Sequence, residues 1–320
     1  AGTGLAVVEA MAMVGSERVR GSIDCTILEA RPHFSHWSPR MPRTSLSRRS
    51  FLAATAGTAA LSRLTPWCGP AAAAEPHGLN LGLQLYSLRG YPVDEALAHA
   101  RDLGFRFVEF YSGMYPLDSD AAAIAAINTK VADLGLTISG YGVVRFTNDA
   151  AANRKIFAFA KAAGIRTLGA DPDPDSFTSL DELVQEFDIR VAIHNHGPTH
   201  RYNKAIDVLQ AVEKHDTRIG ACADLGHYLR SGERPVEVIR LLKGRLYGIH
   251  LKDFAEMQDK TKGVILGKGH IDVPAVMAAL VAAGFPADGA LSIEYEENPK
   301  DPLADIKACE QAARAAIAGL

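Results

Sequence analysis

The chain has 320 residues, of which 48% are apolar, enough for a sizeable core in one large α/β domain or two small ones. The formal net charge of −3 argues against nucleic acid and against an acidic membrane surface as partners. The sequence contains no run of about 20 apolar residues, so we expect no stable membrane span. Its four cysteines have unrelated spacings and predict neither a disulfide framework nor a zinc motif.

The first 74 residues predict a leader rather than part of a folded domain. Residues 1–40 show no hydrophobic periodicity, and we expect them to be unstructured, the product of spurious upstream translation before a true start at Met41. Within 41–74, the stretch SRRSFLA resembles the twin-arginine export signature, and a weakly hydrophobic stretch and small residues follow it, with cleavage expected after Ala74. The alternative is a basic patch before an alanine-rich helix.

This order of features predicts a signal peptide for the twin-arginine translocase, and a bacterial protein that is periplasmic or otherwise exported. Removal of residues 1–74 leaves 26 Lys and Arg against 33 Asp and Glu, a formal charge of about −7. Because this route carries folded proteins, the protein can bind its metal before export. The competing metals of the periplasm then do not decide which ion is taken up.

From Leu79 onward one unit repeats: an apolar strand, a polar loop, an amphipathic helix that ends near a glycine, and the next strand. Helices are predicted over residues 94–103 and 271–283, the second with Asp272 as its cap and Pro274 in its first turn. At the helix exits, glycines are expected to turn the chain in the left-handed conformation. They are Gly104, Gly135, Gly164, Gly244 and Gly284.

Eight strands are expected, each a nearly continuous apolar run, as in a parallel sheet covered on both faces. They are residues 81–86, 105–111, 137–143, 167–170, 190–194, 219–223, 246–251 and 291–295. Eight strand–helix units in about 240 residues predict a single (β/α)8 TIM barrel over residues 75–320. The alternative, a doubly wound open sheet, would carry a glycine-rich nucleotide loop after its first strand, and QLYSLR at 84–89 is no such loop.

Metal-ligand residue types stand at the ends of four of these strands. The stretch RVAIHNHG at 190–197 ends in two imidazoles, and alternation along a strand places His194 and His196 on one face and Asn195 on the other. The chemistry of a (β/α)8 barrel lies at the carboxyl ends of its strands. We therefore predict that one divalent ion is held by His194, Asp224, His250 and Glu294.

Two imidazoles and two carboxylates suit an ion of the Mn, Zn, Co or Fe type, whereas calcium prefers an all-oxygen shell. Such an ion polarises a carbonyl or hydroxyl oxygen and stabilises the enediolate that forms when a neighbouring C–H loses its proton. The predicted catalytic residues for proton transfer are His196, His227, Lys252 and Glu294, and Glu296 is a further nearby base.

The mature chain resembles the xylose-isomerase-like barrel superfamily of sugar isomerases, epimerases and dehydratases, which also includes a DNA-repair endonuclease branch. The resemblance covers essentially residues 79–319. It rests on LQLYSLR at 83–89, DLGH at 224–227, HLKD at 250–253, GKGHID at 267–272 and IEYE at 293–296. It implies a carbohydrate substrate and a metal held by an acid on strand five together with Asp224, His250 and Glu294.

Strand five departs from the family, because many relatives have Glu-Asn-His where this chain has His194-Asn195-His196. With an imidazole in place of the carboxylate, the formal charge of the four ligands together with a 2+ ion is about zero instead of about −1. In epimerase relatives the carboxylates of strands five and eight serve as paired bases, so this change argues against strict two-base epimerisation. Aldose–ketose isomerisation remains, as does elimination beside a carbonyl, which needs one base and one acid.

The predicted function is thus a divalent-metal-dependent carbohydrate isomerase or epimerase acting through an enediolate. The alternative is a keto-sugar or keto-glycoside lyase, or a dehydratase of the inosose type. A DNA-repair endonuclease would need a basic groove and histidines near Glu109 or Gly140, which the sequence lacks. A non-catalytic periplasmic sugar-binding protein is a further alternative, against which the full set of four ligand residues argues.

Five residues are candidates for binding the sugar: Tyr86, Glu109, Asp171, Arg230 and Glu296. The carboxylates of Glu109 and Asp171 accept sugar hydroxyls or, alternatively, cap loops. Arg230 holds an acidic or hydroxylated group, or instead pairs with Glu233 on the surface. Both tryptophans lie in the leader, so sugar stacking is expected from Tyr86, Tyr141, Tyr228 or Phe254.

Overall fold

The structure is a computed structural model and describes residues 76–320. The predicted upstream segment, twin-arginine motif and cleavage site, all within residues 1–74, lie outside the described residues. Among the described helices, none combines the length and the apolar character needed to cross a membrane.

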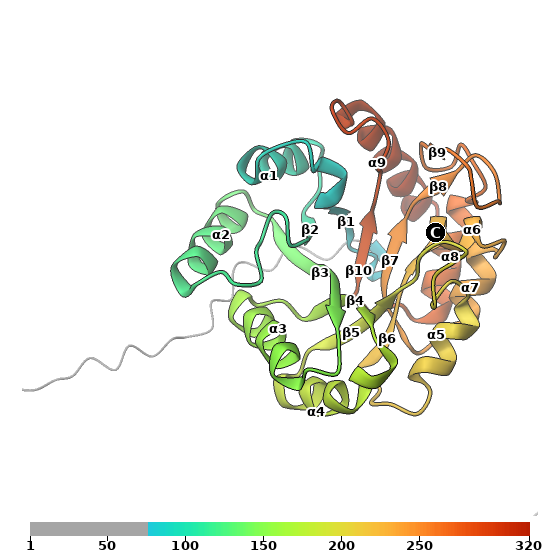
Figure 1. Cartoon of the computed structure of the whole chain (residues 1–320). Helices are drawn as coiled ribbons and strands as arrows, with labels where there is room; N and C mark the ends of the chain where they lie inside the picture. Colours follow the sequence, from blue (N-terminus) through green and yellow to red (C-terminus); the bar gives the residue numbers. More distant parts are fainter. Residues whose placement is uncertain (1–75) are drawn as a thin grey trace, which may run out of the picture. The chain divides into compact units, whose positions relative to one another are not determined.

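Eight parallel strands close into a barrel in the order β1-β10-β7-β6-β5-β4-β3-β2, with helices around the outside (Figure 1). The strands are β1 (Leu81–Gln84), β2 (Phe107–Phe110), β3 (Thr137–Phe146), β4 (Thr167–Pro172), β5 (Arg190–His194), β6 (Ile219–Asp224), β7 (Leu246–Leu251) and β10 (Ala290–Ile293). The predicted single (β/α)8 TIM barrel is confirmed, because each barrel strand pairs in parallel with both of its neighbours.

The covering layer consists of α-helices, with short 3-10 turns beside some strands. The helices are α1 (Val93–Asp102), α2 (Ala121–Asp133), α3 (Ala150–Ala163), α4 (Phe177–Phe187), α5 (Ala205–Val212), α6 (Leu225–Arg230), α7 (Pro235–Leu241), α8 (Val273–Ala283) and α9 (Leu303–Ala318). The 3-10 turns are η1 (Pro76–Gly78), η2 (Leu85–Leu88) and η3 (Pro174–Ser176).

The helix ends follow the expected local chemistry. All five glycines predicted at helix exits have positive φ, as Gly164 shows at 75° after α3, where its N–H donates to the carbonyl groups of the last turn. At the start of α8 the Asp272 carboxylate accepts a hydrogen bond from Ala275 N at 3.0 Å, and Pro274 lies in the first turn. These signals explain why helix–strand junctions were predictable.

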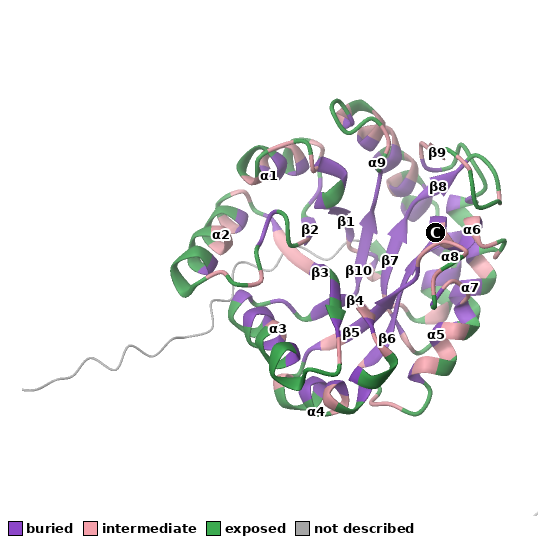
Figure 2. Cartoon of the chain, in the orientation of Figure 1, coloured by how far each residue is buried: buried purple, intermediate pink, exposed green. Residues whose placement is uncertain are grey.

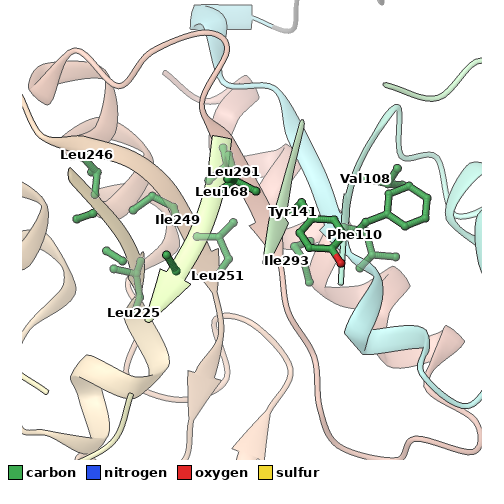
Figure 3. Packing of buried hydrophobic residues seen from close by; sticks show 14 of the residues in the cluster. Val108, Phe110, Tyr141, Leu168, Leu225, Leu246, Ile249, Leu251, Leu291 and Ile293 are labelled. Atoms are coloured by element: carbon green, nitrogen blue, oxygen red, sulfur yellow. The ribbon is translucent and has the colours of Figure 1, made fainter. Parts of the chain in front are cut away.

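The apolar core lies between the barrel and its helices. Figure 2 shows buried strands and helices whose outer faces are exposed. Along β2, β7 and β10, residues such as Val108, Phe110, Ile249, Leu251 and Leu291 alternate with polar ones and are fully or almost fully buried (Figure 3). The polar side chains between them contact one another across the inside of the barrel.

The barrel interior is narrow and depends on small residues. A Cβ at Gly140 on β3 would lie 3.1 Å from Ala290 Cβ and 3.4 Å from Glu109 Cγ. A Cβ at Gly142 would lie 2.7 Å from the Gly169 carbonyl oxygen. Gly140 therefore leaves room for the Glu109 side chain, and Gly142 lets the backbones of β3 and β4 approach closely.

Two predicted strands end two residues earlier than expected, and one hairpin was not predicted. β1 stops at Gln84 because the Gln84 side chain accepts a hydrogen bond from Tyr86 N at 3.1 Å and starts the η2 turn. β10 stops at Ile293, so Glu294 and Glu296 stand in the segment after the strand. An additional antiparallel hairpin of β8 (Asp253–Phe254) and β9 (Gly263–Val264) follows β7.

Candidate metal centre

The four predicted ligands meet at the carboxyl end of the barrel. His194 ends β5, Asp224 ends β6, His250 lies near the end of β7, and Glu294 follows β10. Each offers one ligand atom, all of these atoms lie within 4.8 Å of one another, and all four residues are buried. Strand ends that lie far apart in the sequence are thus brought to one point by the closed parallel barrel.

The separations between ligand atoms suit a first-row divalent ion. His194 Nε2 lies 3.0 Å from His250 Nδ1 and 3.7 Å from Asp224 Oδ2, and His250 Nδ1 lies 3.2 Å from Glu294 Oε2. An ion about 2.0–2.2 Å from each nitrogen and oxygen requires neighbouring ligands roughly 3–3.5 Å apart. Small adjustments of the Asp224 side chain would complete such a shell.

Orphaned polar atoms point to the same conclusion. Asp224 Oδ2 and Glu294 Oε2 are buried and have no aligned hydrogen-bond donor among the described residues. Lys252 Nζ lies 3.1 Å and 2.8 Å from these oxygens, close enough for charge attraction but without hydrogen-bond alignment. Buried carboxylate oxygens left without donors are costly, so we infer that the residues present fit a divalent cation.

Glu109 supports the centre from below instead of lining the cavity. Its Oε2 lies 3.1 Å from His250 Nε2 and accepts a hydrogen bond from Ser292 Oγ at 2.7 Å, and it is buried. It was predicted to bind the sugar, but it lies one layer inside the barrel. Cys222 also lies near this carboxylate and His250, in a second set of ligand-type side chains.

Asn195, which the sequence analysis did not select, joins two of the ligand-bearing strands. Its Nδ2 donates to the Asp224 carbonyl at 3.0 Å, and its Oδ1 accepts from Asp224 N at 2.8 Å. Asn195 therefore fixes the end of β5 against the end of β6, while His194 and His196 extend toward the cavity. An amide between two histidines was the only signal for it in the sequence.

The DLGH motif forms a tight turn from β6 into α6. Asp224 Oδ1 accepts a hydrogen bond from His227 N at 2.8 Å and caps the helix, which leaves Oδ2 for the centre. A Cβ at Gly226 would lie 2.7 Å from the Lys252 carbonyl oxygen. Glycine at this position therefore allows α6 to approach the end of β7 and brings His227 beside the centre.

A cavity of about 320 Å³ opens above the centre. Six of the predicted catalytic and sugar-binding residues line it: Tyr86, His196, His227, Lys252, Glu294 and Glu296. The lining also includes five residues not expected from the sequence, namely Gln84, Tyr111, Ser112, Gly142 and Val143. The Tyr86 and Tyr111 rings lie 5.2 Å apart, edge to face. Of the tyrosines expected to stack on sugar, Tyr141 and Tyr228 are fully buried in the core.

Asp171 and Arg230 lie outside the cavity lining. Asp171 Oδ2 lies 3.3 Å from His200 Nε2, beyond His196. Arg230 donates to Asp259 and approaches His227, so the suggested pairing with Glu233 is wrong. Instead, the Glu233 carboxylate accepts a hydrogen bond from the backbone of α5.

Burial and charge set the protonation of the cavity walls. Burial lowers the pKa of His227 to about 4 and also lowers the pKa of His196, so both imidazoles are neutral at pH 7. Burial opposes the charge of Lys252, but the carboxylates of Asp224, Glu294 and Glu296 raise its pKa well above the usual value. The site therefore combines two neutral imidazoles with one ammonium group.

The chain is a parallel (β/α)8 barrel with four ligand-type side chains that converge at its carboxyl end. A family model described as xylose isomerase-like TIM barrel matches residues 97–313, and the chain belongs to this family. The predicted family is confirmed.

Individual relatives were found among curated proteins and solved structures. An inosose dehydratase of Clostridium botulinum (strain Eklund 17B / Type B) is 28% identical over 136 residues, which are 38% of this chain and 45% of the relative. The match thus spans about half of that protein. A solved, uncharacterized protein from Parabacteroides distasonis ATCC 8503 is 26% identical, with a TM-score of 0.59 over 74% of this chain and 99% of the other. An L-ribulose 3-epimerase shares the fold, with 18% identity and a TM-score of 0.59 over 75% of this chain and 96% of the other.

Proposed function

We propose that the protein is a divalent-metal-dependent carbohydrate isomerase or epimerase that acts through an enediolate on a sugar or keto-sugar. One observation supports this most: four buried ligand-type side chains converge beside a cavity lined by further proton-transfer groups. The names of the relatives, a sugar epimerase and an inosose dehydratase, support a carbohydrate substrate.

When bound, an ion at this centre would polarise a substrate oxygen and stabilise negative charge on it. The chain's own groups then move the proton. His196 is neutral and lines the cavity, so this imidazole can accept a proton. Glu294 offers a carboxylate to the same cavity, and Lys252 Nζ lies 2.8 Å from Glu296 as a proton donor.

The second candidate is a keto-sugar or keto-glycoside lyase or dehydratase. Elimination requires one base and one acid that protonates the departing oxygen, and Lys252 can supply that proton. Among the described residues lining the cavity, both carboxylates come from the segment after β10, whereas β5 contributes imidazoles. This asymmetry favours a one-base reaction over two-base epimerisation, and the curated relatives are named inosose dehydratases.

The test compares the wild type with Asp224→Asn, using metal-loaded protein in deuterium oxide and a panel of ketoses and keto-glycosides. We expect deuterium at the carbon beside the carbonyl, with an isomer or epimer as product, and the loss of both metal and exchange in the variant. An unsaturated product would identify the lyase or dehydratase. The matched control is Asp288→Asn, which removes a carboxylate that pairs with Arg190 at the start of β5, the opposite end of that strand from His194.

Full activity of Asp224→Asn in the presence of a chelator would contradict the proposal. Sugar binding that metal removal leaves unchanged, without proton exchange at any carbon, would favour a non-catalytic sugar-binding protein.

We also propose export through the twin-arginine pathway to the periplasm, supported by the order of basic, apolar and small residues within 41–74. Replacement of Arg48 and Arg49 by lysine should retain the protein in the cytoplasmic fraction of the producing cell. Unchanged fractionation of this variant would contradict the proposal.

A further inference from the structure

We propose that Arg230 is a positioning residue: it holds His227 as the tautomer protonated at Nε2, so that His227 donates a hydrogen bond toward the cavity instead of accepting a proton there. The proposal rests on the proposed function only for the nature of the acceptor, a substrate oxygen. The arrangement itself is a property of the resting protein.

The hydrogen bond between the two side chains carries the argument. Arg230 Nη1 lies 3.3 Å from His227 Nδ1. A guanidinium group has only donors, so Nδ1 must be the acceptor, and the proton of the neutral ring must be on Nε2. His227 Nε2 lies 3.8 Å from Asp224 Oδ2, and the ring lines the cavity. The N–H thus lies on the side of the candidate metal centre.

Arg230 is itself held in place by the connection between β8 and β9. Its Nε donates to the Asp259 carbonyl at 2.9 Å, and its Nη2 donates to Asp259 Oδ1 at 3.0 Å. The guanidinium carbon also lies 5.7 Å from the centre of the Phe254 ring. Because Asp259 holds both Nε and Nη2, the orientation of the planar guanidinium group is fixed. Its third nitrogen, Nη1, therefore faces His227.

The strand-five motif is adapted to the same contact. A Cβ at Gly197 would lie 3.1 Å from Cζ, Nη1 and Nη2 of Arg230. The glycine that closes HNHG therefore leaves the space that the guanidinium occupies. Three segments meet at Arg230: the loop after β5, helix α6 and the β8–β9 connection. A residue with only a surface role would not need this many contacts.

This arrangement divides the work between the two cavity imidazoles. His227 donates a hydrogen bond to a substrate oxygen on which negative charge develops. His196, which lines the same cavity, remains the imidazole able to accept the proton.

The test is nitrogen NMR of zinc-loaded protein labelled with ¹⁵N-histidine, in which long-range proton–nitrogen spectra distinguish the tautomers of each ring. The His227 signals are assigned as those missing from His227→Gln. We expect Nε2–H in the wild type, a mixture or the Nδ1–H tautomer in Arg230→Met, and partial recovery in Arg230→Lys, which still donates. The control, Arg240→Met on the exposed side of α7, should leave the tautomer unchanged.

A proton on Nδ1 in the wild type, or an unchanged tautomer in Arg230→Met, would overturn the proposal. Where Arg230→Met does not fold, Asp259→Asn keeps Arg230 but loosens it, and we expect a partial shift in the same direction; no shift contradicts the proposal. For the proposed reaction, Arg230→Met should slow proton exchange by about 100-fold, with Arg230→Lys intermediate. Because the spectra need no turnover, failure of the proposed function leaves the tautomer result intact.

Discussion

At the residue scale, His250 has a partner for each ring nitrogen. Nε2 faces the Glu109 carboxylate, which Ser292 holds in place, and Nδ1 faces the other ligands. Because the Glu109 carboxylate accepts from Nε2, a His250 ring that binds an ion would keep its proton there and present the Nδ1 lone pair to the ion. Such outer partners orient a ligand and raise its basicity.

We therefore predict that Glu109→Leu lowers the affinity for Zn²⁺ or Mn²⁺ by about 10–100-fold. Glu109→Gln should lose less metal affinity, because its amide oxygen can still accept a hydrogen bond from His250 Nε2. Calorimetric titration of the metal-free proteins measures both. Equal affinity of the wild type and Glu109→Leu would show that Glu109 does not support the centre.

Lys252 balances the charge of the centre when no metal is bound. Its ammonium group is buried and lies within 3.1 Å of both ligand carboxylates, Asp224 and Glu294. We predict that Lys252→Met lowers the free energy of unfolding of the metal-free protein by about 3–5 kcal/mol, because two buried carboxylates lose their counter-charge. Metal should restore most of this loss.

Urea unfolding with chelator and with saturating zinc measures the effect. The control is Lys130→Met, which removes an exposed lysine paired with Asp94 and should cost about 1 kcal/mol or less. Equal losses for the two lysine variants in chelator would contradict the account.

At the scale of elements, Asp253 organises the segment that follows β7. Its carboxylate accepts hydrogen bonds from five backbone N–H groups at 2.8–3.1 Å. They belong to Phe254, Gly267, Gly269, His270 and Ile271. The last residue of HLKD thereby anchors the GKGHID loop, and it does so without facing the cavity above the centre.

We predict that Asp253→Ala lowers the free energy of unfolding by about 4 kcal/mol, since hydrogen bonds to a charged acceptor contribute about 1.5–3 kcal/mol each and the loop can recover some of them from water. Asp272→Ala, which removes only the cap of α8, should cost about 1 kcal/mol. Urea unfolding compares the two variants. Similar losses would contradict an anchoring role for Asp253.

The elements that sequence reasoning missed are those with the weakest local signal. Strands β8 and β9 have two residues each, too few for periodicity to indicate. The early end of β1 depends on the side chain of Gln84, a contact that no apolar pattern encodes. By contrast, the barrel strands and helix exits were predictable, because long apolar runs and left-handed glycines each impose one local conformation.

At the scale of the whole molecule, the four proposed ligands could be selected from sequence because a closed parallel barrel brings its strand ends together. Roles that depend on depth or on loop contacts could not be selected in this way. Glu109 stands near the end of β2, yet its side chain lies below His250 rather than in the cavity. Tyr111 lines the cavity from the segment just after β2, and Val143 lines it from β3, where the register with β4 shifts between Tyr141 and Val144.

Stability should depend on pH through His227. Its pKa falls from 6.5 to about 4 through burial, so between these values the unfolded chain binds a proton that the folded protein does not. The wild type should therefore lose about 3 kcal/mol from this group as the pH falls from 6.5 to 4, and none above that window. His227→Gln should lose correspondingly less. Urea unfolding in chelator at several pH values tests this, and identical pH slopes would contradict it.

The central claim is that one divalent ion is held by two imidazoles and two carboxylates at the carboxyl end of the barrel. X-ray absorption at the zinc edge, on protein loaded with one equivalent of zinc, tests it most directly. We predict one tightly bound zinc per chain with only nitrogen and oxygen neighbours at about 2.0–2.2 Å. A sulfur neighbour at about 2.3 Å, as Cys222 would supply, or no stoichiometric binding, would contradict the account.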